Sequence, residues 1–351
     1  MMGATLKNEL ALQIKEMALL LGYSNCGIIK VSDVADYAQK LEERMSRVRL
    51  GLVAYGQFRK FATPQKEHEW AKSIILTVTN NTVYSIPEEL KGFYAKSYLV
   101  DNRLDELSEG WARRIAFEDF LDSLSIRSFT EPRFGVTALR WAASKAGLGI
   151  IRSNNFLYTQ DGSEVRVNAW LIDQELELVN SVELNQCPEN CGKCIEACPT
   201  KALSAPYTTS LVDCVSFLTS LSVDKGMGIP SAKQQEQIGC WIYGCDICQD
   251  VCPFNKDKWR GGRDFPGLHE IAEKLLPENI MAMSYSEMAD TLGSKFWYIS
   301  TDKLWKWKIN ALVSMSNRYE ERYKKAIESG LTDEDKRVRK FAKSVCKKLA
   351  I

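Results

Sequence analysis

The sequence predicts a mixed fold, α+β or α/β, in three parts. Strand-like and helix-like stretches alternate through residues 1–180, which is typical of an α/β domain. Nine of the eleven cysteines fall between residues 187 and 252, and they define a second domain over residues 181–260. Only helical patterns follow, so residues 261–351 are predicted to form a small helical domain. A length of 351 residues leaves room for these parts and for a sizeable core.

Each element of the N-terminal domain has its own pattern. The opening helix carries an apolar stripe, and Gly22 ends it. The run IILTV at 74–78 is uncharged and apolar except for Thr77, as in a strand buried inside a sheet. The pair Asp161-Gly162 is a turn signal that predicts a hairpin. The predicted helices cover residues 5–22, 33–48, 99–124 and 136–147, and the predicted strands cover 26–31, 70–81 and the hairpin arms 154–159 and 165–172.

The C-terminal domain contains two clear helices, at 304–317 and 334–350. Residues 265–292 add further helices with turns. A pair of helices with a short connector and a periodic apolar face resembles one helical solenoid repeat of the HEAT type. One repeat cannot bury its own apolar face, so we expect it to pack on the body of the protein.

No stretch of the sequence is suited to span a membrane. Glu9, Lys15 and Glu16 interrupt the first apolar helix, and no other window approaches about 18 uncharged apolar residues. The formal net charge of +1 gives no overall field that would attract nucleic acid or membrane. We therefore expect a cytoplasmic protein in a reducing compartment, where clustered cysteines indicate metal or redox chemistry.

The cysteine spacing is close to that of bacterial two-cluster ferredoxins, C-x2-C-x2-C-x3-C-P. The two runs are CPENCGKCIEACP (187–199) and CDICQDVCP (245–253). In these ferredoxins the cysteine before the proline ligates the other cluster. Cluster 2 then has three assigned ligands, and Cys214 and Cys240 are the candidates for the fourth. The rule assigns Cys187, Cys191, Cys194 and Cys252 to cluster 1, and Cys198, Cys245 and Cys248 to cluster 2.

Two [4Fe–4S] clusters in one module form an electron relay. The alternative is a pair of structural zinc ribbons, because paired CxxC motifs are also a zinc spacing. The repeated x3-C-P extension favours iron–sulfur clusters. No GxGxxG follows a strand, so a Rossmann dinucleotide site is not supported, and no GxSxG nucleophile elbow is present. With two histidines in the chain, a histidine-rich metal site is excluded. Cys26 and Cys346 are isolated and are predicted to be small buried hydrophobic residues.

The cysteine region resembles that of the epoxyqueuosine reductases. These are cobalamin-dependent enzymes with two [4Fe–4S] clusters that complete queuosine in tRNA, and they are related to the reductive dehalogenases. The similarity is closest over residues 187–255 and extends more weakly over most of the chain. The segments that carry it are CVSFLTS (214–220), IYGCDICQDVCPFN (242–255), KAGLGIIRSNNFLYT (145–159), SEVRVNAWLIDQELEL (163–178), AKSYLVDNRL (95–104) and the two C-terminal helices.

The resemblance implies the missing ligand and a cofactor site. In the family, the cysteine of a CxSYLT-like segment completes the second cluster, and here that residue is Cys214. Cys240 is then an extra residue that binds no cluster. A corrinoid would bind near the AGLG segment, although a hairpin entry without any ligand is the alternative for the polar residues there. The corrinoid-binding residues that the resemblance implies are Tyr98, Gly147, Gly149, Arg152, Asn154 and Asn155.

The chain departs from the family where substrate chemistry is expected. The family's catalytic aspartate lies in an F-V-D-S/T-x-P segment, for which Glu131 is the nearest match, although an ungapped alignment places Arg133 there. A carboxylic acid can protonate a leaving oxygen, whereas an arginine has too high a pKa. The histidine that follows the family's tyrosine is Leu99 here. The family pattern AGLG-W-x-G-K reads AGLG-IIRS, so Arg152 stands at the position of its third glycine.

The leading interpretation is an iron–sulfur oxidoreductase of the epoxyqueuosine reductase type. An external low-potential donor, of the ferredoxin or flavodoxin type, would supply electrons through both clusters to a corrinoid, with Glu131 as the proton donor. The alternative for Glu131 is a loop carboxylate in solvent, and the alternative for Tyr98 is an aromatic residue on a helix face. Two alternatives remain: a corrinoid-dependent reductase of another small substrate, and an electron-transfer protein without corrinoid.

The basic C-terminal helices are predicted to contact tRNA, with a solvated charged face as the alternative. Trp305 and Trp307 interleave with these basic residues. The set comprises Lys303, Lys306, Lys308, Lys336, Arg337, Arg339, Lys340, Lys343, Lys347 and Lys348.

Overall fold

The computed structural model describes residues 2–101, 103–222 and 226–351. A four-stranded sheet with the order β1-β2-β6-β3 organises its N-terminal part. All neighbouring strands are antiparallel. The predicted mixture of helices and strands is therefore confirmed, and the sheet belongs to the antiparallel kind. The strands are β1 (Asn25–Lys30), β2 (Ser73–Asn80), β3 (Ser128–Phe129) and β6 (Val165–Ile172).

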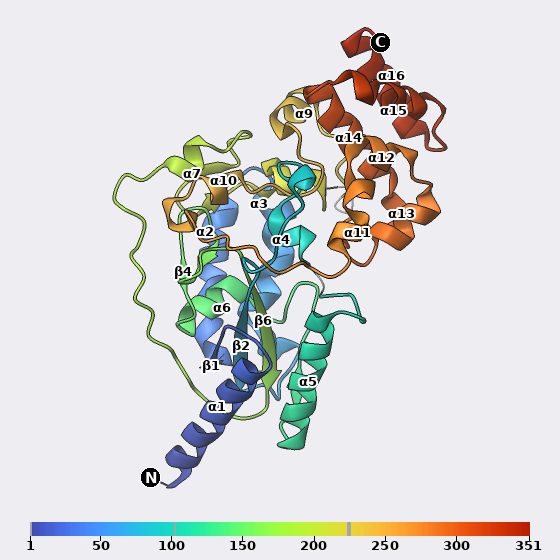
Figure 1. The fold of residues 1–351 in the computed structure, drawn as a ribbon. Helices are drawn as coiled ribbons and strands as arrows, with labels where there is room; N and C mark the ends of the chain where they lie inside the picture. Colours follow the sequence, from blue (N-terminus) through green and yellow to red (C-terminus); the bar gives the residue numbers. More distant parts are fainter. Residues whose placement is uncertain (1, 102, 223–225) are drawn as a thin grey trace.

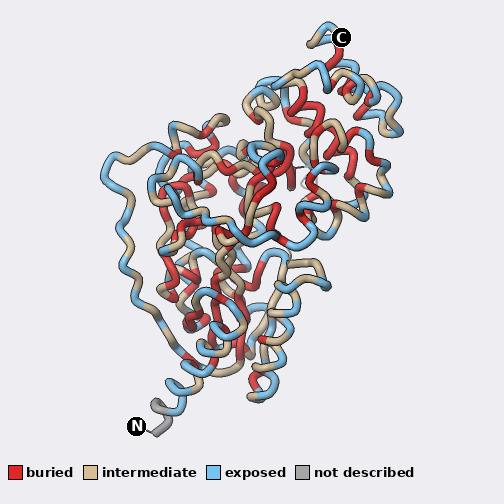
Figure 2. The backbone as a smooth tube through the Cα atoms, viewed as in Figure 1, coloured by how far each residue is buried: buried red, intermediate tan, exposed pale blue. Residues whose placement is uncertain are grey.

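Helices cover both faces of this sheet (Figure 1). Alternate side chains of β2 point to opposite faces: Ile74 and Leu76 pack against α6 (Leu139–Lys145), and Ile75 packs on the other side. That second face is covered by α1 (Met2–Leu20) and α5 (Glu109–Ser123). Buried residues accordingly follow the sheet and the inner sides of the helices in Figure 2. The run 74–78, predicted as an interior strand, is thus buried on both faces.

The helix predicted over 99–124 begins later than expected. The short α4 (Lys96–Leu99) ends there, and α5 starts at Glu109, where the Ser108 side chain accepts a hydrogen bond from the Trp111 N–H as an N-cap. Between them the buried Asp101 forms ion pairs with Arg103 and Arg166, at 3.2 and 3.1 Å. Asp101 and Arg103 lie outside both helices, so the predicted helix is interrupted here.

The predicted hairpin pairing is wrong. The arm 165–172 is β6, but it pairs with β2 and β3 in the central sheet. The other arm contains β5 (Leu157–Tyr158), which pairs with β4 (Ile150–Ile151) in a separate two-stranded ribbon. The turn signal was correct, because Thr159 and Gly162 form a tight antiparallel bridge. A long apolar strand such as β6 gains more from burial in the sheet than from pairing with its short neighbour.

The cysteine region is built from short elements. Residues 173–192 run mostly without regular structure along one side of the molecule to reach it (Figure 1). The helix α7 packs against α10, which brings the two cysteine runs together. The elements are α7 (Lys193–Glu196), β7 (Leu203–Ala205), β8 (Thr208–Thr209), α8 (Val215–Thr219), α9 (Ala232–Ile238) and α10 (Ile247–Asp250).

The C-terminal helices share one core with parts of the other two regions. Trp307 and Leu312 belong to the same buried cluster as Tyr94 from the N-terminal part and Tyr243 from the cysteine region. The rings of Tyr243 and Trp307 stack at 5.0 Å. As expected, this helical unit packs on the body of the protein. Its helices are α11 (Leu268–Ala272), α12 (Pro277–Ala282), α13 (Tyr285–Leu292), α14 (Trp305–Asn317), α15 (Lys324–Ser329) and α16 (Lys336–Leu349).

Two further helices, α2 (Tyr37–Arg47) and α3 (Gly51–Tyr55), pack on each other between the sheet and the cysteine region. Cys26 and Cys346 are both buried in apolar clusters, as the sequence predicts. None of the helices within the described ranges is long and apolar enough to cross a membrane.

Replacing Gly147 by alanine should destabilise the fold. Gly147 has a φ of +69°, and an added Cβ would lie 1.8 Å from the backbone oxygen of Asn180. Gly92 has a φ of +82° with nothing within 4 Å of an added Cβ, so it is a matched control. We expect G92A to lower the free energy of unfolding by about 1 kcal/mol and G147A by about 3 kcal/mol, as measured by denaturant titration. If G147A and G92A lose the same free energy of unfolding, the contact with Asn180 does not contribute to the loss.

Candidate functional site

Four cysteines from both runs face one cavity at the surface of the cysteine region. Cys187, Cys191 and Cys194 come from the loop before α7 and from α7 itself, and Cys252 follows α10. Burial raises the pKa of Cys194, and negative charge on the other three thiols acts in the same direction. We call these four residues the first tetrad. Exposed residues 188–190 border it, so this tetrad lies close to solvent.

A second group of four cysteines lies deeper. Cys198 comes from the first run, Cys245 and Cys248 come from the second, and Cys214 lies just before α8. Burial raises the pKa of Cys248, and negative charge on Cys214, Cys245 and Cys198 raises it further. The same neighbours act on Cys245. These four residues, the second tetrad, are therefore close enough to interact electrostatically.

Cys240 lies apart from both tetrads. The charges that act on its thiol come from Arg318 and Glu320. Its backbone oxygen accepts a hydrogen bond from Ser314 of α14 at 3.0 Å. Of the two candidates for the open position, the structure brings Cys214 to the other three cysteines.

The two tetrads fit two [4Fe–4S] clusters. Each cluster requires four thiolates around a cube, and each tetrad supplies four cysteine sulfurs. Each tetrad also takes a cysteine-proline residue from the other run, which is the ligation pattern of two-cluster ferredoxins.

A large cavity of about 790 Å³ lies between α2, α3, α6 and the β4-β5 ribbon. This volume is in the range of cofactor and ligand sites. Its wall includes Arg44, Tyr55, Arg140 and Asn155. Burial raises the pKa of Tyr55 to about 12, and negative charge on Cys214 acts in the same direction. Cys214 also packs against the apolar cluster that contains Tyr55, so the second tetrad lies beside this cavity. The first tetrad approaches the cavity too, because Tyr207 lines it and negative charge on Cys187 acts on the Tyr207 hydroxyl.

Hydrogen bonds organise the polar wall of the large cavity. The Asn155 side chain accepts a hydrogen bond from the Arg44 guanidinium at 3.0 Å and donates one to the Thr209 hydroxyl at 2.7 Å. Arg140 donates to the backbone oxygen of Asn155 at 2.9 Å. Sequence reasoning missed Arg44, Tyr55 and Arg140, because they lie on helices without a local motif and meet only through the tertiary fold.

The residues predicted near a corrinoid separate into three groups. Gly149 and Asn155 line the large cavity. Arg152 and Asn154 instead line the cavity of the first tetrad, and the Asn154 amide donates to the backbone oxygen of Cys248 at 3.0 Å. The other two lie elsewhere. Gly147 packs on the backbone of Asn180, and Tyr98 lies in an aromatic cluster with its hydroxyl 3.1 Å from that of Ser216.

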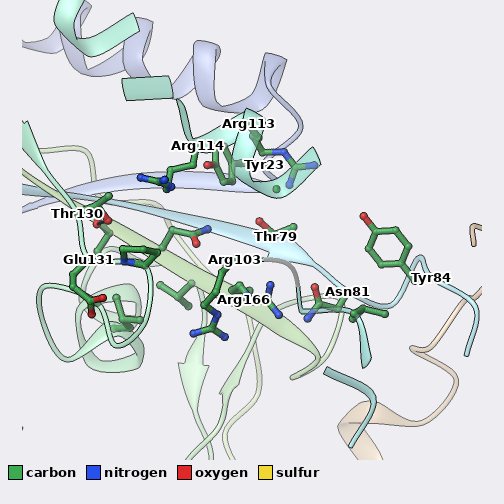
Figure 3. Close-up of a pocket in the computed structure, with 18 of the residues that line it drawn as sticks. Tyr23, Thr79, Asn81, Tyr84, Arg103, Arg113, Arg114, Thr130, Glu131 and Arg166 are labelled. Carbon is green, nitrogen blue, oxygen red and sulfur yellow. Dashed lines mark hydrogen bonds between the residues drawn. The ribbon is translucent and has the colours of Figure 1, made fainter. Parts of the chain in front are cut away.

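Glu131 faces a different cavity, which is lined by Tyr23, Asn81, Arg103 and Arg166 among others. Figure 3 shows Glu131 at one end of this cavity and Tyr84 at the other. The Glu131 carboxylate accepts hydrogen bonds from the backbone N–H groups of Arg133 and Phe134, at 2.9 and 2.6 Å. Its oxygens therefore hold the turn of their own loop, which was not expected of a proton donor.

The predicted basic surface of the C-terminal helices is smaller than the sequence suggested. Lys306 and Lys308 are buried, and Lys308 forms an ion pair with Asp333 at 2.7 Å. Trp305 and Trp307 are buried as well, because all of α14 up to Met315 lies inside the helical unit. The exposed basic side chains are concentrated on α16, at Lys336, Arg337, Arg339, Lys340, Lys343, Lys347 and Lys348.

Known proteins share both the site and the fold. Residues 186–255 match the family model of the 4Fe-4S double cluster binding domain. An epoxyqueuosine reductase of Cellulophaga algicola is 30% identical over 255 residues, which is 69% of this chain and 78% of the relative. Another, of Cyclobacterium marinum, is 28% identical over 84% of this chain and 92% of the relative.

Solved structures share the whole architecture. A selenomethionine-labelled epoxyqueuosine reductase superposes with a TM-score of 0.80 at 23% identity, covering 98% of this chain and 91% of that one. An epoxyqueuosine reductase solved with an epoxyqueuosine-modified tRNA-Tyr stem loop superposes with a TM-score of 0.74 at 21% identity, covering 98% of this chain and all of that one.

Fold, tetrads and family model together define an iron–sulfur oxidoreductase with a double-cluster domain. Because the Cellulophaga relative is 30% identical and is covered over 78% of its length, the chain belongs to the epoxyqueuosine reductase family. The resemblance predicted from the cysteine region is confirmed.

Replacing Cys214 should remove one cluster, whereas replacing Cys240 should remove none. C214S takes a thiolate from the second tetrad, so we expect about four irons in place of about eight after anaerobic reconstitution. C240S is the matched control, because its thiol lies in the same region but outside both tetrads, and it should keep about eight irons. Iron and sulfide analysis provides the readout. The opposite pattern would assign Cys240 as the ligand.

Proposed function

We propose that this chain reduces the epoxide of epoxyqueuosine in tRNA, using two [4Fe–4S] clusters and a corrinoid. The observation that carries the proposal is the position of the second tetrad beside the large cavity. An electron that reaches the second cluster would be next to whatever the cavity holds. The similarity to proteins named epoxyqueuosine reductase supports the substrate.

The first tetrad lies nearer to solvent than the second, and this difference gives the electron relay a direction. The ligands would be Cys187, Cys191, Cys194 and Cys252 for cluster 1, and Cys198, Cys214, Cys245 and Cys248 for cluster 2. Cluster 1 lies near solvent, so an external low-potential donor of the ferredoxin or flavodoxin type would deliver electrons there. Reduction of an epoxide to an alkene consumes two electrons and two protons and releases one water, so the relay must turn over twice for each substrate.

The large cavity would hold the corrinoid. Arg44, Arg140 and Asn155 present charged and amide groups that suit its amide and phosphate substituents. Tyr55 and the aromatic residues around it give an apolar wall that excludes water. When bound, the corrinoid would supply a reducible cobalt centre, while the chain positions and shields it.

The position and hydrogen bonds of Glu131 favour a second candidate function, which is the reduction of another small substrate. Its carboxylate is engaged by its own loop and faces the cavity of Figure 3 rather than the large cavity. The family's acid is therefore not reproduced in place. Queuosine formation in tRNA by the loaded enzyme separates the two candidates, because a reductase of another substrate would bind the corrinoid without forming queuosine.

Filling the large cavity should block corrinoid binding without loss of the clusters. S144W places an indole in the cavity, whereas S123W makes the same change on α5, remote from it. Both serine hydroxyls donate to the carbonyl three residues earlier, so the local loss is matched. We expect both variants to hold about eight irons and S144W to bind cob(II)alamin at least tenfold more weakly, read by EPR titration. If the wild type holds the irons but binds no cobalamin, the chain is an electron-transfer protein.

Reversing charges on α16 should weaken tRNA binding. Lys340, Lys343 and Lys347 lie on one exposed face of this helix. We expect K340E/K343E/K347E to weaken stem-loop binding about tenfold and to reduce the salt dependence of log K by about 2. The control K60E/K66E/K72E makes the same charge change on the N-terminal domain and should bind normally. If the two triple variants bind the stem loop equally well, the tRNA does not bind at α16.

A further inference from the structure

Arg152 is a buried cation without a carboxylate partner. Its side chain is 2% exposed, and its Nε and Nη1 atoms have no hydrogen-bond partner among the residues that the structure describes. None of the ion pairs within those residues involves Arg152. A buried charge is costly unless an opposite charge or hydrogen bonds compensate it. The Arg152 side chain also hydrogen-bonds the Cys187 thiol. The described residues therefore compensate the guanidinium only in part.

The surrounding chain fixes where the guanidinium lies. It stacks on the ring of Phe254, with its central carbon 3.3 Å from the ring centroid, and it lies 5.1 Å from the centroid of Tyr158. A tight turn holds its backbone, because the Arg152 N–H donates to the carbonyl of Phe156 and the Asn155 N–H donates to the carbonyl of Arg152. The guanidinium thus cannot swing to solvent without breaking the stack on Phe254.

The guanidinium lines the same cavity as the first tetrad. Arg152, Cys187, Cys191, Cys194 and Cys252 all border it. Phe254, on which the guanidinium stacks, lies two residues after Cys252 and borders the cavity too. The guanidinium of Arg152 therefore lies beside the four cysteine thiolates, which supply negative charge at this point of the structure.

We infer that Arg152 is a positioning residue for cluster 1 that compensates its negative charge and raises its reduction potential. The inference rests on the two clusters of the proposed function. Four thiolates and a [4Fe–4S]²⁺ core carry a net charge of −2, and uptake of one electron from the donor makes it −3 without breaking any bond. A fixed positive charge beside the cluster stabilises the −3 state more than the −2 state. Cluster 1 would then accept electrons more readily than a cluster that has no positive charge beside it.

The family segment AGLG-W-x-G-K, which this stretch resembles, has a glycine at this position, and a glycine supplies no charge. Arg152 lines the cavity of the first tetrad and is not among the residues that line the large cavity, so its charge acts on the solvent side of the relay. A higher potential at the entry cluster suits a donor that is less strongly reducing.

The test is a redox titration of reconstituted, full-length protein followed by EPR. Removing the charge with R152Q should weaken electron uptake by one of the two clusters about tenfold, which is a shift of about −59 mV for a one-electron couple, and leave the other unchanged. R152K, which keeps the charge, should shift less than R152Q. R263Q removes an exposed arginine that pairs with Glu109 and should shift neither cluster.

The outcomes separate this inference from the proposed function. If R152Q holds about eight irons and both potentials are unchanged, or if R152K shifts as far as R152Q, the inference is wrong while the clusters stand. If the wild type holds no iron–sulfur clusters, the proposed function itself fails. If R152Q loses a cluster, wild-type protein labelled with ¹⁵N-arginine decides: a ¹⁵N hyperfine coupling on a reduced cluster supports the contact, and its absence overturns it.

Discussion

The exchange of cysteines between the two runs is the constraint on which the rest of the structure depends. Cys198 leaves the first run to join the second tetrad, and Cys252 leaves the second run to join the first. Neither tetrad can form unless α7 and α10 lie against each other. Apolar residues support this arrangement as well, because Val215 and Leu218 of α8 and Ile238 of α9 belong to the same buried cluster as the C-terminal helices.

The surrounding domains hold this exchange in place from two sides. The side chain of Asn310 in α14 donates to the backbone oxygens of Thr219 and Ile242, both at 2.8 Å, and so ties α8 to the segment before Cys245. On the other side, the Asn154 amide donates to the backbone oxygen of Cys248. The helical unit and the sheet domain therefore both form hydrogen bonds with the segments that carry the second tetrad. These contacts hold the second tetrad beside the large cavity.

The sequence predicted what depends on local patterns and on ligand chemistry. The apolar run of β2, the C-terminal helices and the cysteine-proline motifs all carry short-range signals, and each appears near its expected place. The partner of β6 was missed, because strand pairing is decided by burial in the sheet rather than by the nearest turn. The late start of α5 accompanies ion pairs of Asp101 with the neighbouring Arg103 and with Arg166 of β6, and no local pattern records the contact with β6. The polar wall around Asn155 was missed for the same reason.

The dependence of the second tetrad on α14 also has a consequence for biogenesis. The peptide before Cys245 is held by the stacked rings of Tyr243 and Trp307 and by hydrogen bonds from Asn310. On a ribosome, residues up to the end of α14 at Asn317 must be synthesised and released from the exit tunnel before this support exists. The support for the deeper tetrad therefore forms only after α14 has left the exit tunnel, well after the cysteines of the first run have emerged.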